Sequence, residues 1–200
     1  MTTDTTARIA LASFAAFALC AIAVHFLRPD LDGWATPLSF YLVGAHGAWL
    51  KAAYVALATG TAALAIGLHR ALEPAARSAA PTLLFLVAAC GIVATALADT
   101  DLPRHDATFE GYVHGNAART AFLGITAAML LQSWRFRGDA RWRARFAPAF
   151  GLAALAFALL WVHTLWRGSP RGLGQKLVVA LVVAWLVTAA VWLLRSARNR

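Results

Sequence analysis

Long apolar segments alternate with short polar ones along the whole chain. Six segments rich in Ala, Leu and Val approach the roughly 20 residues that a helix needs to cross the hydrocarbon core of a bilayer. They are Ile9–Leu27, Ala52–Leu68, Pro81–Ala98, Val113–Leu131, Ala147–Trp166 and Leu177–Leu194. The pattern therefore predicts six transmembrane helices.

The apolar segments are continuous and do not alternate with polar residues, as the strands of a membrane barrel would. The turns between them are short, so neighbouring helices should pack antiparallel. We expect an all-α fold, a single polytopic membrane domain over residues 1–200. Composition agrees: 60% of the residues are hydrophobic and 14% are charged, against about 25% charged in a typical soluble domain.

The first apolar segment and the two cysteines each have a simple structural interpretation. The first segment is longer than the apolar region of a usual signal peptide, so we interpret it as a helix, although Ala21-Ile22-Ala23 leaves cleavage open. Cys20 and Cys90 both lie within apolar segments and form no CxxC pair. We expect both to be small buried residues.

The charges predict an orientation. Eleven of the 18 Lys and Arg residues fall on one side of the predicted helices: Arg8, Arg70, Arg77, Arg135, Arg137, Arg141, Arg143, Arg145, Arg195, Arg198 and Arg200. The positive-inside rule assigns this side, with both termini, to the cytoplasm of a cytoplasmic (inner) membrane. The net charge of +9 is then explained by topology and by contact with anionic lipid headgroups, and no nucleic-acid partner is expected.

Acids and histidines gather on the opposite, outer side. The acids there are Asp30, Asp32, Asp99, Asp101, Asp106 and Glu110. The histidines are His25, His46, His105, His114 and His163, at or near the outer ends of five helices. Imidazole and carboxylate are the ligands of zinc and similar divalent ions, and a zinc-bound water could hydrolyse a substrate. Because the chain has no HExxH motif, such a site would be assembled from different helices. A haem held by two outer histidines is the less favoured alternative.

Outer cations suggest a third kind of site. Arg28, Arg119, Arg167 and Lys176 could hold a lipid phosphate without any chemistry. Arg119 falls inside an apolar segment, where an arginine needs a partner or water. We expect it either to pair with Asp99 or Asp101 or to bind a substrate anion. Lys51 lies near a helix end, where its side chain can extend to the interface.

The outer residues also resemble a known family. "HFLRPDLD" and the following "SFYLVGAHGAW" are similar to the opening of the DUF998 proteins, bacterial and archaeal six-helix membrane proteins of uncharacterised function. The residues that match are His25, Arg28, Pro29, Asp32, Ser39, Tyr41, Gly44, Gly47, Thr100, Asp101, Gly111, His114, Gly172, Leu173, Gln175 and Lys176. Phe40 replaces an acidic residue of the pattern and Asp99 replaces a proline, while Lys176 matches only as a basic residue, because the pattern has arginine there.

The resemblance narrows the predicted site to His25, Arg28, Ser39, Tyr41, Asp101 and His114. We expect a site for a lipid or small amphiphile, with a divalent metal such as zinc held by His25, Asp101 and His114 if the protein is a hydrolase. Ser39 and Tyr41 are then the catalytic candidates that hydrogen-bond substrate, and Arg28, Arg119 and Lys176 bind it. The alternative is a non-catalytic accessory subunit or lipid-binding partner of a larger membrane-protein complex.

Overall fold

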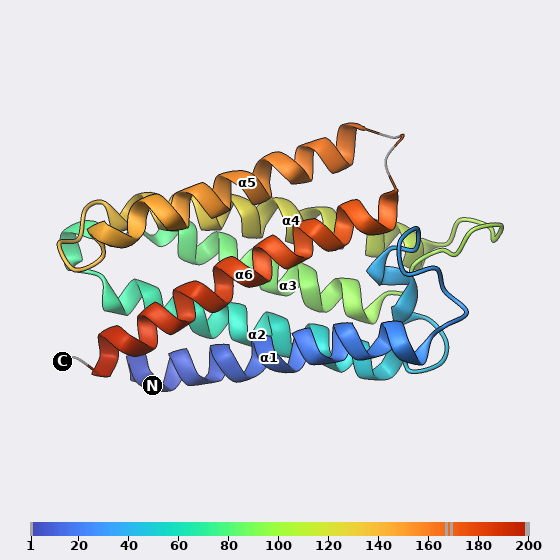
Figure 1. The fold of residues 1–200 in the computed structure, drawn as a ribbon, viewed down its shortest axis with the longest axis horizontal. Helices are drawn as coiled ribbons and strands as arrows, with labels where there is room; N and C mark the ends of the chain where they lie inside the picture. The colour runs from blue at the N-terminus through green and yellow to red at the C-terminus, as the bar shows by residue number, and fades with distance from the viewer. Residues whose placement is uncertain (1, 167, 169, 199–200) are drawn as a thin grey trace.

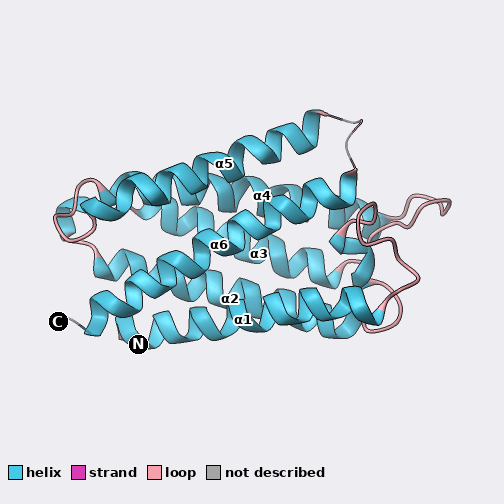
Figure 2. Cartoon of the chain, viewed as in Figure 1, coloured by secondary structure: helices cyan, strands magenta, loops and turns pink. Residues whose placement is uncertain are grey.

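The structure is a computed structural model that describes residues 2–166, 168 and 170–198. Six long helices make up most of the described chain (Figure 1): α1 (Thr3–Leu27), α2 (Gly47–Ala71), α3 (Ala79–Leu97), α4 (Phe109–Phe136), α5 (Phe146–Leu165) and α6 (Arg171–Arg198). Three short 3₁₀ helices lie between them: η1 (Leu38–Leu42), η2 (Pro74–Ala76) and η3 (Arg143–Arg145). The described residues contain no strand (Figure 2). The prediction of an all-helical fold is confirmed, and each observed helix covers its predicted segment to within two residues.

The helices form one elongated bundle. Each helix packs against the next in sequence, and α6 returns to pack against α1 and α2. Both termini lie at the same end (Figure 1). The opposite end, which we call the polar end, carries the α1–α2 connection (residues 28–46), the α3–α4 connection (residues 98–108) and the start of α6.

Five of the described helices are long and apolar enough to cross a membrane: α1, α2, α3, α5 with the η3 turn before it, and α6. Helix α4 is long enough but is not among them. Its first half carries His114, Asn116 and Arg119, which lower its hydropathy. A set of long apolar helices is typical of a multi-pass membrane protein; whether α4 also crosses the membrane stays a prediction.

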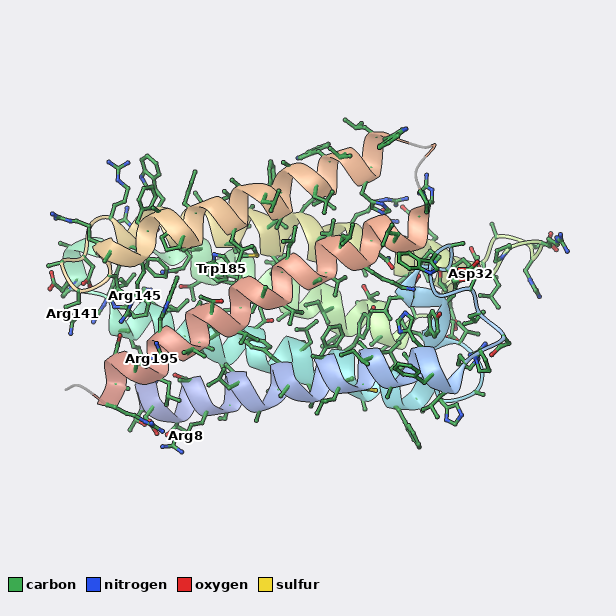
Figure 3. The ribbon with its side chains drawn as sticks, viewed as in Figure 1. Arg8, Asp32, Arg141, Arg145, Trp185 and Arg195 are labelled. Atoms are coloured by element: carbon green, nitrogen blue, oxygen red, sulfur yellow. The ribbon has the colours of Figure 1, made fainter. Side chains whose placement is uncertain are left out.

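The end that holds the termini is basic. Arg8, Arg141, Arg145 and Arg195 lie there, while Asp32 lies at the other end (Figure 3). The carboxylate of Asp139 is fully buried and accepts hydrogen bonds from the backbone N–H groups of Glu73 (2.8 Å) and Arg141 (2.9 Å). It thereby ties the α2–α3 connection to the α4–α5 connection.

The core between α4, α5 and α6 is anchored by Trp185. Its buried indole N–H donates to the carbonyl of Ala149 (3.0 Å) and lies 3.2 Å from the hydroxyl of Ser133. Such satisfied donors allow a large amphipathic ring to be buried.

The two cysteines differ from the prediction, since Cys20 is half-buried and Cys90 is exposed. The prediction that both are buried was wrong because α3 turns Cys90 toward the outside of the bundle.

Candidate functional site

The α1–α2 connection is folded around Arg28. Its guanidinium donates to both carboxylate oxygens of Asp30 (Nε–Oδ1 2.9 Å, Nη2–Oδ2 2.8 Å). On its other edge, Nη1 donates to the carbonyl of Val43 (2.9 Å) and more weakly to that of Ala45 (3.3 Å). The hydrogen bond to Arg28 lowers the pKa of Asp30. Arg28 thus joins the beginning of the connection to its end.

Asp32 stabilises the turn that follows. Its Oδ1 accepts hydrogen bonds from the backbone N–H groups of Trp34 (2.7 Å) and Ala35 (3.0 Å). These bonds, from Ala35 first and then Trp34, lower the pKa of the Asp32 carboxyl. An aspartate that bonds the backbone two and three residues ahead is a common turn-former.

The first turns of α6 dock onto this connection at three points. The N–H of Gly172 donates to the carbonyl of Ala35 (3.1 Å). The side-chain oxygen of Gln175 accepts the N–H of Leu38 (2.7 Å), and Nζ of Lys176 donates to the carbonyl of Gly33 (2.6 Å). The "GLGQK" segment therefore holds the connection against the bundle.

The α3–α4 connection is closed by Asp101. Its carboxylate accepts from the hydroxyl (2.7 Å) and the backbone N–H (3.2 Å) of Thr108, whose hydroxyl in turn caps α4 by accepting the N–H of Gly111. A side chain at Gly111 would collide with the Asp101 carboxylate. Six residues into α4, Nδ1 of His114 bonds the carbonyl of Ala98 (2.9 Å), next to the end of α3.

His25, Tyr41 and Lys176 form a cluster where α1, η1 and α6 meet. The rings of His25 and Tyr41 lie 4.6 Å apart between centroids, and Nζ of Lys176 lies 5.2 Å from the centre of the Tyr41 ring. Tyr41 is fully buried and its hydroxyl has no hydrogen-bond partner. Burial raises the pKa of Tyr41, so the hydroxyl is protonated at neutral pH and available as a donor.

The cluster stands at the head of a groove between α1 and α6. The groove has a volume of about 740 Å³. His25 and Lys176 supply ionisable groups at one end, and apolar side chains line the rest: Phe17, Ala18, Ala21, Ile22, Phe26, Leu38, Val179, Ala180, Val183, Ala184 and Val187, with Thr188 at the far end. Because α1 ends and α6 begins at the polar end, His25 and Lys176 lie at that end of the groove.

A smaller cavity of about 60 Å³ lies deeper in the bundle. Ser39, His114 and Gln175 contribute polar groups to it, and it shares Phe17, Val179 and Val183 with the groove. Since a carbonyl can only accept, the bond from His114 Nδ1 to Ala98 places the proton on Nδ1. The lone pair of the neutral ring is then on Nε2. The same reasoning applies to His25, whose Nδ1 bonds the carbonyl of Ala21 (2.7 Å).

The three predicted metal ligands have separate surroundings. His25 lines the groove, His114 lines the deeper cavity, and Asp101 is bonded to Thr108. Within residues 2–166, 168 and 170–198, no three His, Cys, Asp or Glu side chains are grouped as a metal site requires. Zinc and haem binding stay predictions.

The predicted substrate-binding residues also differ from one another. Arg28 is engaged in the connection, whereas Lys176 reaches the groove. The ion pair predicted for Arg119 was wrong: Asp99 accepts from Lys51 (2.6 Å), and Arg119 instead donates to Asn116 (3.2 Å). Lys51, near the start of α2, therefore forms an ion pair with Asp99, which follows the end of α3. Arg167 lies outside the described residues.

Comparison with models of known protein families identifies the family of this chain. A family model described as "Protein of unknown function (DUF998)" matches residues 11–192. The chain belongs to the DUF998 family. Comparisons with curated proteins and with solved structures gave no match.

Nine of the residues that carry the DUF998 resemblance form two groups. Arg28, Asp32, Asp101, Gly172 and Gln175 each make the contacts that hold a connection in place. A second group has polar atoms without a hydrogen-bond partner among the described residues: Nε2 of His25, the hydroxyls of Ser39 and Tyr41, and Nε2 of His114. His25 lines the groove, Ser39 and His114 line the deeper cavity, and Tyr41 packs against His25. These residues are therefore the candidates for a binding site.

Sequence reasoning missed the groove. Val183, Ala184 and Val187 are ordinary residues of an apolar helix, and no motif distinguishes them from those that face lipid elsewhere. Only the placement of α6 against α1 shows that they line a groove. For Gln175 the signal was present in the "GLGQK" segment, but no motif pairs its side chain with the backbone of Leu38.

Proposed function

We propose that this protein binds a lipid or another small amphiphile, with the chain in the α1–α6 groove and the polar head at His25 and Lys176. The observation that carries the proposal is the change along one groove from an apolar lining to ionisable groups. From Lys176 to Thr188 the groove follows α6 for roughly 18 Å at 1.5 Å per residue. An amphiphile has the same division between an apolar and a polar part.

The head of the groove offers both kinds of hydrogen-bonding group. Nζ of Lys176 uses one of its three donors on Gly33, so two remain for a phosphate or carboxylate. Nε2 of His25 can accept, and the ring of Tyr41, which does not line the groove, packs against the His25 ring. A ligand that bonds these groups would satisfy polar atoms that are otherwise left without partners, which is favourable in an apolar setting.

The proposal is limited to binding. The metal-dependent hydrolase predicted from the sequence would use His25, Asp101 and His114 as ligands, and these residues have separate surroundings. Ser39 and His114 line the deeper cavity beside the groove, and we propose that they contact the polar head of a ligand that extends inward. We further propose that the polar end faces the outside of a cytoplasmic membrane, because the basic side chains gather at the opposite end.

Filling the groove should prevent binding. Ala184 lines the groove on α6, and Ala16 lies on α1 outside it; both residues are exposed. We expect Ala184→Trp to weaken binding of an NBD-acyl phosphatidylcholine by about tenfold or more, because the indole occupies the volume of the chain, and Ala16→Trp to leave binding unchanged. Fluorescence polarisation in maltoside micelles measures both.

If the two variants bind the probe as tightly as the unsubstituted protein, the groove holds no chain. That result would favour the alternative, a non-catalytic subunit of a membrane-protein complex, in which the polar groups only tie the connections together.

A further inference from the structure

A separate cavity lies on the other side of α6, between α4, α5 and α6. It has a volume of about 520 Å³. Its basic lining residues are Arg119 from α4, His163 from α5 and Arg171 from α6, and no Asp or Glu of the described chain lines it. Phe122, Leu160 and Val178 form part of the apolar wall. A cavity with basic groups and no acid is complementary to an anion.

The two arginines of this cavity are available to a ligand. Arg119 is exposed and spends one donor on the side chain of Asn116. Arg171 is exposed, and within the described part of the chain it has no side-chain hydrogen bond or ion pair. A guanidinium has five N–H donors in a planar fork that matches phosphate or carboxylate oxygens.

The acids of the polar end do not neutralise these arginines. Four of them are already engaged: Asp30 by Arg28, Asp32 by backbone N–H groups, Asp99 by Lys51 and Asp101 by Thr108. Asp106 and Glu110 are exposed, on the α3–α4 connection and in the first turn of α4, and neither lines the cavity. The positive charge of the cavity is therefore uncompensated by the described lining.

His163 adds a directed donor. Its Nδ1 is buried without a hydrogen-bond partner and faces Gly174, where an added Cβ would come within 2.6 Å of it. A proton on Nδ1 would be a buried donor without an acceptor, which is costly. The neutral ring therefore carries its proton on Nε2, the nitrogen left to contact a ligand.

We propose that this cavity binds a phosphate group, held by Arg119 and Arg171 and by the Nε2–H of His163. The apolar wall suits the glycerol and upper chain of a phospholipid, and a free phosphate has the same head chemistry. The site is distinct from the α1–α6 groove. The groove is lined by Lys176, Val179 and Val183, which lie on another side of α6. It does not depend on the function proposed for the groove.

Thermal unfolding in maltoside micelles tests the proposal. The midpoint is followed with added phosphatidylglycerol, with phosphatidylcholine and with inorganic phosphate against chloride at equal ionic strength. We expect phosphatidylglycerol to raise the midpoint by several degrees, since a ligand that binds only the folded state stabilises it. Arg119→Gln and Arg171→Gln should each weaken the apparent affinity by about tenfold, because each removes charge-assisted hydrogen bonds.

Two control variants make the result specific. Arg104→Gln removes an exposed arginine of the α3–α4 connection that does not line the cavity, so it should keep the full response. Ala184→Trp fills the other groove and should also keep it, which separates this proposal from the first. A response to inorganic phosphate as well as to phosphatidylglycerol identifies the phosphate group as sufficient, and a response to the lipid alone shows that the chain is required; both support the site. The proposal is overturned if Arg119→Gln responds like the unsubstituted protein, or if Arg104→Gln loses as much as Arg119→Gln.

Discussion

Replacing Gly172 with alanine is expected to lower the free energy of unfolding by about 3 kcal/mol, the upper part of the range for overpacked sites. A Cβ at this position would lie 2.6 Å from the backbone of Trp34, Ala35 and Thr36. These are main-chain atoms of a connection held by Asp32, Gln175 and Lys176, so they cannot move aside cheaply. The α6 helix must shift away, and the bond from the Gly172 N–H to Ala35 is weakened with it.

Gly151 provides the matched control for Gly172. It lies in α5, and nothing is within 4 Å of an added Cβ. Gly151→Ala should therefore be neutral or stabilising by up to about 1 kcal/mol, the difference in helix propensity between the two residues. Thermal unfolding followed by circular dichroism in micelles measures both variants. Equal midpoints for Gly172→Ala and Gly151→Ala would contradict the docking of α6 on the α1–α2 connection.

Arg28→Ala is expected to lower the free energy of unfolding by about 2 kcal/mol, in the range for hydrogen bonds to a charged group. The largest part of the loss comes from the carbonyls of Val43 and Ala45, which Arg28 holds from the other end of the connection. The pair with Asp30 contributes less, because the Asp30 side chain is 59% exposed and exposed ion pairs are weak.

Asp30→Ala therefore serves as the control for Arg28→Ala, with an expected loss below about 1 kcal/mol. The same circular-dichroism measurement compares them. Arg28→Ala should also keep its affinity for the NBD-acyl probe at temperatures where it is folded, since Arg28 does not line the groove. A variant that is as stable as the unsubstituted protein but no longer binds the probe would return Arg28 to the substrate-binding role that the sequence suggested.

The helices were predictable because each needs only length and apolar composition. The apolar signal was weakest for α4, because His114, Asn116 and Arg119 interrupt its apolar sequence. The helix nevertheless forms. Its place in the bundle depends on α3 and α5, which pack on either side. Composition alone does not contain that information.

The candidate site was predictable as a location but not as an arrangement. The gathering of acids and histidines at one end of the chain's helices followed from their positions, and Tyr41 and His25 do lie together. Arg28 and Asp101 were expected to bind substrate or metal, yet each is occupied by the connection it closes. The path of residues 28–46 and 98–108 decides which polar side chains hydrogen-bond within the connections and which are left to bind a ligand. No periodicity in the sequence specifies that path.

Photo-crosslinking with a phospholipid that carries a diazirine in mid-chain tests the central claim most directly. Ile22 and Leu19 lie on α1 and are similarly exposed, at 59% and 69%, but only Ile22 lines the groove. Bulk lipid would label both about equally. If the groove binds a chain, adducts mapped by mass spectrometry will concentrate on Ile22 and Val183 over Leu19, and excess unlabelled lipid will suppress them. Adducts spread evenly over Ile22 and Leu19, with no competition by unlabelled lipid, would contradict the account.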